Sequence, residues 1–187
     1  MSALWLASGS PRRRQLLEWA GFAVEVHPSH LPEHHTPGQD PVEWARALAV
    51  DKARTGPADR VVLAADTVVH VGHRVFDKPA DRAEATTHLR ALSGRWHVVT
   101  TGVCVRGGGE EHVLHASTRM RFRDLATPEV AAYLATGEAD DKAGAYGIQG
   151  RAGAFVAELR GSWTNVMGLP LEAALEALAA CGAHPWT

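Results

Sequence analysis

Cysteine is scarce in this chain, since Cys104 and Cys181 are the only two among 187 residues. Two cysteines cannot form the dense disulfide framework of a small secreted domain, so we predict two reduced structural thiols. Long apolar runs are also missing: none approaches the roughly 18 residues that a membrane-spanning helix needs, which predicts no membrane partner. The N-terminal residues lack a basic segment and a long apolar segment, so we expect no secretory signal and a cytoplasmic protein.

Charge of one sign and aromatic side chains are scarce as well. Lysine and arginine number 19 against 21 aspartate and glutamate, which gives a formal net charge of −2, and aromatic residues make up 6%. Nucleic-acid-binding domains usually show a strongly basic balance or aromatic stacking platforms, so we predict no nucleic-acid partner. Hydrophobic residues at 45% and charged residues at 21% are ordinary for a globular chain, and the length predicts one domain, 1–187.

Predicted helices and strands alternate along the chain, which favours the α/β class with a mixed sheet. Ser10 suits a helix N-cap, Pro11 a first helical position and Gly21 a helix end. Three glycines at 107–109 predict the turn of one hairpin. The expected helices are 11–20, 40–56, 81–94, 127–137 and 171–180, and the expected strands are 3–7, 61–65, 96–105, 113–122 and 154–159.

A stretch rich in histidine and proline, 27–38, predicts a loop. The helix after it has Trp44, Ala47 and Leu48 as its expected apolar face. The loop histidines suggest a metal centre, but no His-Glu-x-x-His or cysteine–histidine spacing accompanies them. We therefore expect a loop with several histidines and no metal bound by them; these are His27, His30, His34 and His35.

The first predicted helix begins with residues that do not favour its stability. Arg12, Arg13 and Arg14 occupy its first turn, where cations oppose the positive end of the helix dipole. A bound anion reverses that effect, because the turn offers backbone N–H groups, guanidinium groups and the hydroxyls of Ser8 and Ser10 to phosphate oxygens. A solvated basic face is the alternative, since the segment matches no lysine-containing phosphate loop.

Asp66 follows the most hydrophobic predicted strand, either at its end or interrupting it. A carboxylate beside a buried strand is unfavourable unless it is paired, hydrogen-bonded or bound to metal. Carboxylates at strand ends in α/β sheets tend to lie in the ligand crevice, which makes Asp66 a candidate catalytic residue. A structural aspartate that caps a turn or pairs with a lysine is the alternative.

Three lysines and one glycine-rich segment complete the candidates. Lys52, Lys78 and Lys142 lie near predicted element ends, and each taken alone is typical of a surface lysine. The segment 143–150 carries three glycines and Gln149, whose amide can pair with the edge of a base. Taken alone, however, the segment is better explained as a tight turn between sheet elements.

Six motifs, in the same order along the chain, resemble the Maf family. Within that pattern, Ala139 stands in place of a common proline and Met167 in place of valine. The resemblance covers nearly the whole chain, and chance similarity does not produce so many motifs in one order. The motifs are Leu6–Arg13, Leu63–Val69, Asp77–Pro79, Leu92–Gly94 with His97, Asp141–Gly150 and Asn165–Pro170.

Maf proteins are nucleoside triphosphate pyrophosphatases named for a link to septum formation. The resemblance implies an elongated, mixed-sheet α/β fold similar to that of inosine triphosphatases, with two lobes around a deep cleft and often a homodimer. It also implies cleavage of a nucleoside triphosphate substrate between its α and β phosphates, with Mg²⁺ or Mn²⁺, to the monophosphate and pyrophosphate. The motif at 141–150 is similar to that of the branch acting on dTTP and UTP.

The resemblance also implies roles for single residues. Asp66 matches the family's proton acceptor, and it is a candidate metal ligand together with Glu33; the sequence does not separate these two roles. Arg12, Thr67 and Gln149 match positions tied to substrate choice. Ser8, Arg13, Lys52 and Lys78 match positions that line the phosphate and metal site, and Ser10 and Lys142 are further candidates for binding substrate.

Two alternatives stay open. A 7-methyl-GTP pyrophosphatase would belong to the sister branch of the family, but the late motif of that branch departs from the form seen here. A non-catalytic nucleotide-binding regulator of septum formation is disfavoured, because every candidate catalytic position carries the expected residue.

Overall fold

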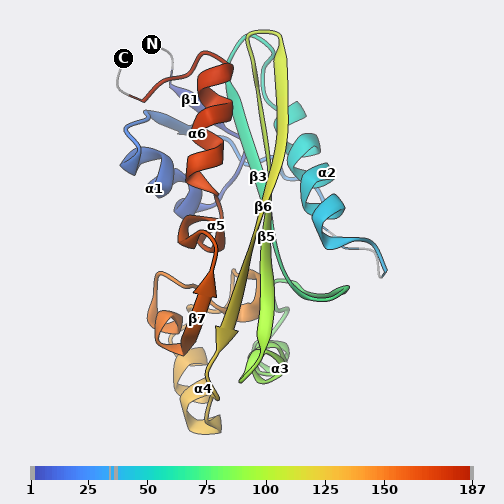
Figure 1. Cartoon of the computed structure of the whole chain (residues 1–187), viewed down its shortest axis with the longest axis vertical. Coiled ribbons are helices and arrows are strands. Elements are labelled where there is room, and N and C mark those ends of the chain that lie inside the picture. The colour runs from blue at the N-terminus through green and yellow to red at the C-terminus, as the bar shows by residue number, and fades with distance from the viewer. Residues whose placement is uncertain (1–2, 34, 36–37, 186–187) are drawn as a thin grey trace.

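The computed structural model describes residues 3–33, 35 and 38–185, and it forms an elongated α/β molecule (Figure 1). A long hairpin of β5 (Trp96–Gly107) and β6 (Glu110–Phe122) runs along the long axis (Figure 1). Helix α2 (Pro41–Arg54) lies on one side of it and α6 (Leu171–Ala180) on the other (Figure 1). The predicted α/β class and mixed sheet are confirmed, whereas the two lobes stay a prediction. In the part of the chain that the structure describes, no helix is long and apolar enough to span a membrane.

The described residues form one mixed sheet of seven strands, in the order β2-β1-β3-β5-β6-β7, with β4 paired to β3. Strand β1 runs parallel to β2 and β3, and all other pairs are antiparallel. Besides the hairpin, the strands are β1 (Leu4–Leu6), β2 (Val24–Val26), β3 (Val62–Val71), β4 (Arg74–Phe76) and β7 (Val156–Arg160).

Helices α2 (Pro41–Arg54) and α3 (Arg82–Leu92) begin directly after capping aspartates. Asp40 and Asp81 each accept hydrogen bonds from first-turn N–H groups, of α2 and α3 respectively. Ser10 occupies the N-cap position of α1, as predicted, but its side chain makes no capping hydrogen bond. The remaining helices are α1 (Pro11–Trp19), α4 (Thr127–Leu134) and α5 (Trp163–Met167), with 3₁₀ turns η1 (Ala143–Ala145) and η2 (Arg151–Phe155).

One edge of β3 has a gap between its partners. Strand β1 pairs only with the first two residues of β3, and β4 pairs only with the last three. Asp66 lies in this gap, in the middle of a continuous ten-residue strand, so the prediction of a strand that stops at Ala65 was wrong. A charged residue does not break this strand, because Lys52 of α2 pairs with its carboxylate.

Helix α2 approaches the sheet closely because small residues meet there. A Cβ atom at Gly102 of β5 would overlap the carbonyl oxygen of Ala45, so only glycine allows this packing. The predicted apolar face of α2 was partly wrong: Leu48 is buried, but Ala47 is exposed and Trp44 is half-buried. Alanines make the contact with the sheet, and Trp44 instead lines a cleft.

Both cysteines are free and buried, as predicted. Burial raises the pKa of the Cys104 thiol to about 12, so this thiol is protonated at neutral pH. A neutral, buried thiol behaves as a small apolar side chain. Cys104 therefore contributes packing to the interface between the sheet and α2, where it lies among alanines and valines.

Candidate active site

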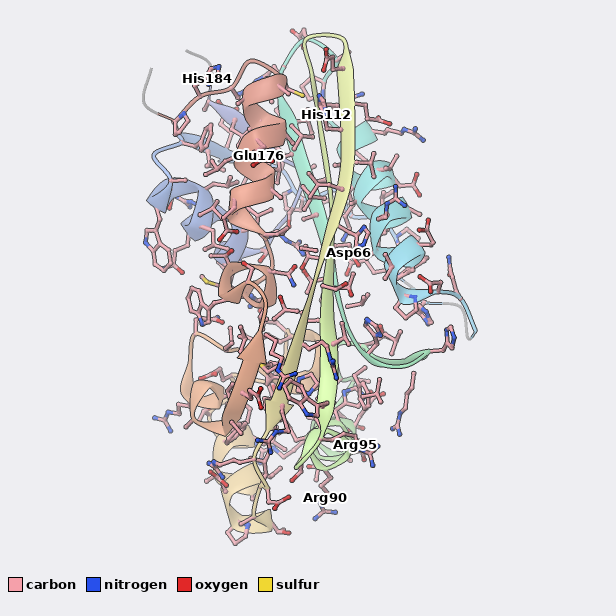
Figure 2. The ribbon with its side chains drawn as sticks, viewed as in Figure 1. Asp66, Arg90, Arg95, His112, Glu176 and His184 are labelled. Carbon is pink, nitrogen blue, oxygen red and sulfur yellow. The ribbon has the colours of Figure 1, made fainter. Side chains whose placement is uncertain are left out.

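A cleft of about 790 Å³ opens beside the gap in the edge of β3. Neighbouring residues of a strand direct their side chains to opposite faces of the sheet, yet Asp66 and Thr67 both line the cleft. The cleft therefore wraps around the open edge of β3. It also adjoins Ser8, just after the carboxyl end of β1, where α/β sheets commonly bind ligands. Asp66 lies near the middle of the molecule's length (Figure 2).

The structure brings all the candidates from the sequence into this one cleft. They come from the turn between β1 and α1, from α1, from the loop before α2, from α2 itself, from β3, and from the two later motifs. Folding thus gathers residues that are far apart in the chain. The candidates that line it are Ser8, Ser10, Arg12, Arg13, Glu33, Lys52, Asp66, Thr67, Lys78, Lys142 and Gln149.

Lys52 joins two carboxylates at the centre of the cleft. Its Nζ donates to Oδ1 of Asp66 at 2.8 Å and lies 2.5 Å from Oε1 of Glu33. The lysine is only 4% exposed, although its type and position suggested a surface residue. Asp66 therefore pairs with a lysine, which was one of the two alternatives given for it from the sequence. Lys52, Asp66 and Glu33 also all line the cleft.

Glu33 is held by two lysines. Its second oxygen accepts a hydrogen bond from Nζ of Lys78 at 2.8 Å. Burial alone would raise the pKa of Glu33, but the hydrogen bonds from Lys52 and Lys78 outweigh it and lower the pKa to about 2. Glu33 is therefore a carboxylate at neutral pH, and the loop before α2 is tied to both α2 and the segment after β4.

The first turn of α1 uses its arginines in different ways. Arg13 is buried, and its guanidinium donates to Ser8 Oγ at 2.9 Å, Thr67 Oγ1 at 3.0 Å and the Gly168 carbonyl at 2.8 Å. Burial lowers the pKa of Arg13, and the nearby negative charge of Asp66 opposes that shift. Arg13 thus braces the wall of the cleft. A simple solvated basic face is ruled out for this residue.

Arg12 remains partly exposed and forms an ion pair with Asp141, with its Nη1 3.3 Å from Oδ2. Asp141 also accepts a hydrogen bond from Lys142 Nζ at 2.5 Å. Two cations therefore share one exposed carboxylate at the mouth of the cleft. A charged ligand can replace this partner, because exposed ion pairs are weak.

The motif around Gln149 also borders the cleft. Its Tyr146 is buried, and the hydroxyl lies 3.1 Å from Nε2 of His97. Burial lowers the pKa of His97 to about 4, so this histidine is neutral and packed at neutral pH. Gln149 itself is exposed, which leaves its amide accessible to a ligand in the cleft.

Some residues of the cleft were not candidates from the sequence. Asp77 lines the cleft beside Lys78, and burial raises the pKa of its carboxyl. Asp77 belongs to the Asp77–Pro79 motif, which could have identified it as a candidate. An aspartate beside a lysine in a turn is, however, equally typical of a local ion pair. Trp44 also lines the cleft, with His35 against its edge at 5.9 Å between ring centroids.

The donor groups of the cleft fit a small divalent cation. Glu33, Asp66 and Asp77 are oxygen donors that line one cleft, and Mg²⁺ or Mn²⁺ prefers oxygen ligands. The described residues contain no cluster of three or more acidic, histidine or cysteine side chains that could hold a metal alone. Mg²⁺ is usually held by one or two carboxylates together with the substrate phosphates.

Two of the loop histidines pack against tryptophan rings. The ring of His27 stacks on Trp5 with 3.4 Å between centroids, and His35 packs against Trp44 as described above. His34 lies outside the described residues. The expectation that these histidines form no metal centre stays a prediction.

Comparison with known proteins places the chain in a family. Residues 3–181 match the family described as Maf-like protein. A protein of Koribacter versatilis is 47% identical over 90% of this chain and 89% of its own, and one of Moorella thermoacetica is 47% identical over 100% and 98%. A protein of Anaeromyxobacter dehalogenans is 49% identical over 90% of this chain and 88% of its own. All three proteins are named dTTP/UTP pyrophosphatase. With a match this long, and an identity this high, the chain belongs to the Maf-like protein family.

Proposed function

We propose that this chain hydrolyses dTTP and UTP to the nucleoside monophosphate and pyrophosphate. The observation that carries the proposal is the buried ammonium of Lys52 between Asp66 and Glu33, in a cleft whose other wall presents further cations. Such a cleft combines a base for water with positive charge for phosphate, which are the requirements of triphosphate hydrolysis. Relatives 44–49% identical are named for this substrate pair.

Asp66 is the group proposed to accept the proton of the attacking water. Its Oδ1 is held by Lys52 at 2.8 Å, which fixes the orientation of the carboxylate. The water oxygen forms a new bond to the α-phosphorus, and the bond from this phosphorus to the oxygen that bridges to the β phosphate breaks. One water proton passes to Asp66. Pyrophosphate leaves with the electron pair of the broken bond.

The cations of the cleft are proposed to bind the triphosphate. Arg12, Lys78 and Lys142 all line the cleft, and their partners among the described residues are carboxylates and a carbonyl. Phosphate oxygens can take the place of these partners. Arg13 acts differently, because its three bonds to the protein hold Ser8 and Thr67 in place. Ser8 and Ser10 border the same end of the cleft.

Glu33 and Asp66 are the residues proposed to hold a divalent cation, Mg²⁺ or Mn²⁺, together with the substrate phosphates. Such an ion neutralises phosphate charge and polarises the phosphoryl group. The loop position of Glu33 and the strand position of Asp66 bring the two carboxylates together only in the folded chain, through their common partner Lys52.

The direct test is a substrate panel with the purified protein. It compares dTTP, UTP, CTP, GTP and 7-methyl-GTP, each with Mg²⁺ or Mn²⁺, and measures pyrophosphate and orthophosphate separately. Pyrophosphate from dTTP and UTP supports the proposal. Preference for 7-methyl-GTP would favour the sister branch, and tight nucleotide binding without products would favour a regulator.

Gln149 is proposed to contribute to base selection, because its exposed amide carries both a donor and an acceptor at the cleft. Replacing Gln149 by glutamate removes the donor and adds a charge. An unpaired or mismatched polar group at a bound base is unfavourable by about 1–3 kcal/mol, so we expect the ratio of kcat/KM for UTP to that for CTP to change by about tenfold.

The matched control for this change is Gln15→Glu, which makes the same substitution on an exposed position of α1. It should leave the ratio between the two bases unaltered. An unchanged ratio in Gln149→Glu as well would exclude Gln149 from base selection.

Three further expectations from the family resemblance stay predictions. They are the homodimer, the location in the cytoplasm and the link to septum formation. Sedimentation of the purified protein checks the first, and its outcome does not bear on the chemistry of the cleft.

A further inference from the structure

The segment that carries Lys142 and Gln149 has little regular structure of its own. Between α4 and β7 the chain forms only two short 3₁₀ turns, η1 and η2. Three residues in it have positive φ angles, Gly137 at 72°, Gly144 at 71° and Ala145 at 60°, of which the last is unusual for a residue with a side chain. The position of this segment must therefore be set by contacts with neighbouring side chains.

Glu138 ties the two ends of the segment together. Its Oε2 accepts a hydrogen bond from the backbone N–H of Arg151 at 3.1 Å. Its backbone carbonyl accepts another from Lys142 Nζ at 2.7 Å. A Cβ atom at Gly150 would overlap the carboxylate of Glu138, so the glycine lets the carboxylate lie directly against the backbone.

Tyr133 of α4 connects this carboxylate to the middle of the segment. Its hydroxyl donates to Oε1 of Glu138 at 3.2 Å and accepts from the N–H of Gly147 at 3.3 Å. The residue is 4% exposed, and burial raises the pKa of the phenol, which therefore stays neutral and keeps its proton. One hydroxyl thus satisfies a carboxylate and a backbone N–H at once.

The backbone of Gly147 contacts both Lys142 and Gln149. A Cβ atom placed on Gly147 would lie 2.9 Å from Cε of Lys142 and 3.4 Å from Nε2 of Gln149. Both side chains therefore rest on the bare backbone of Gly147, at the point that the Tyr133 hydroxyl holds. A shift of this backbone moves both side chains together.

From these contacts we propose that Tyr133 and Glu138 are positioning residues, which form a clamp that sets Lys142 and Gln149 at the cleft. Neither residue lines the cleft, so the clamp acts only through the segment that it holds. The expected effect of the clamp on activity rests on the proposed function. The claim that the clamp fixes the backbone at Gly147 does not depend on that function.

The first test replaces Tyr133 by phenylalanine, which removes the hydroxyl and leaves the ring. We expect kcat/KM for dTTP to fall by about tenfold, because small displacements of substrate-binding groups reduce rates by such factors. Ser93→Ala is the matched control: it also removes a hydroxyl that accepts from a backbone N–H, at 2.8 Å from Leu125 N, but outside the cleft. It should retain full activity.

A double-mutant cycle separates positioning from general loss of stability. In a background that carries Lys142→Ala and Gln149→Ala, the clamp has nothing left to position, so Tyr133→Phe should lower kcat/KM by less than about twofold, because coupled residues are not additive. An equal loss in both backgrounds would overturn the proposal. Glu138→Gln serves as a second variant if Tyr133→Phe folds poorly, since an amide cannot accept from both Tyr133 and Arg151 through its two ends.

Amide hydrogen exchange gives a readout that does not depend on catalysis. Residues 140–150 should exchange faster in Tyr133→Phe and Glu138→Gln than in the unaltered protein, and at the normal rate in Ser93→Ala. Unchanged exchange in both clamp variants would refute the proposal. If the unaltered protein releases no pyrophosphate, the proposed function fails, while exchange and calorimetric binding of dTTP still decide whether the clamp exists.

Discussion

Replacement of Asp66 by asparagine is expected to lower kcat for dTTP by about 10³-fold while the fold is retained. The amide has the shape of the carboxylate but cannot accept a proton from water, and a positioned general base contributes about 10²–10⁴-fold to a rate. The fold should persist because Lys52 keeps its contact with Glu33 Oε1 at 2.5 Å. Steady-state release of pyrophosphate and thermal unfolding of the same sample measure both effects.

The control for this experiment is Asp51→Asn, the same change on an exposed residue of α2 next to Lys52. It should behave as the unaltered protein in both measurements. Turnover by Asp66→Asn within tenfold of normal would refute the assignment of Asp66, whether as base or as metal ligand. A large loss accompanied by early unfolding would instead show a structural role.

The positions of some helices could be predicted from the residues at their ends. Helix α6 occupies 171–180 as predicted, and α2 and α3 begin within one residue of the starts expected at 40 and 81. The strands β2 and β4, of three residues each, were not predicted. A strand this short has no detectable alternation of its own, because its existence depends on the neighbour with which it pairs.

The residues of the cleft could be proposed from the sequence, but their partnerships could not. The motifs led to Asp66, Glu33 and Lys52, whereas the bridge that Lys52 makes between the two carboxylates depends on how α2 packs on the sheet. That packing rests on the absence of a side chain at Gly102, which no local pattern reveals.

The burial of Arg13 was equally beyond the sequence. Three adjacent arginines look alike in the chain, yet Arg13 is buried with three protein acceptors, and Arg14 pairs with Glu18 at the surface at 2.7 Å. The acceptors of Arg13 come from the end of β1, from β3 and from the turn after α5. Only the tertiary arrangement places them around one guanidinium.

Replacement of Lys52 by methionine is expected to lower kcat/KM for dTTP by about 10²-fold and to destabilise the fold most strongly near neutral pH. Without the ammonium, Asp66 and Glu33 lose their common partner, and a buried charge left unpaired is strongly unfavourable. Methionine has a similar length, so the loss reflects charge more than volume. Arg54→Met removes a cation from the exposed end of the same helix and should change neither activity nor stability appreciably.

The pH dependence of the stability difference gives the sharper test. In the unaltered protein the pKa of Glu33 is about 2, below its usual 4.5, although burial opposes this shift. A carboxyl with a lowered pKa stabilises the fold above its unfolded-state pKa, and that contribution disappears as the pH falls toward the folded-state value. In Lys52→Met only Lys78 still opposes burial, so the pKa of Glu33 rises and the contribution shrinks.

The difference in unfolding free energy between Lys52→Met and the unaltered protein should therefore be large at pH 7 and become smaller between about pH 4.5 and 2, where Glu33 protonates. Urea unfolding at pH 7 and at pH 3 measures it. A difference that is the same at both pH values would show that Lys52 acts through packing alone. In that case the two carboxylates would not depend on its charge, and the proposed arrangement of base, lysine and glutamate would lose its electrostatic basis.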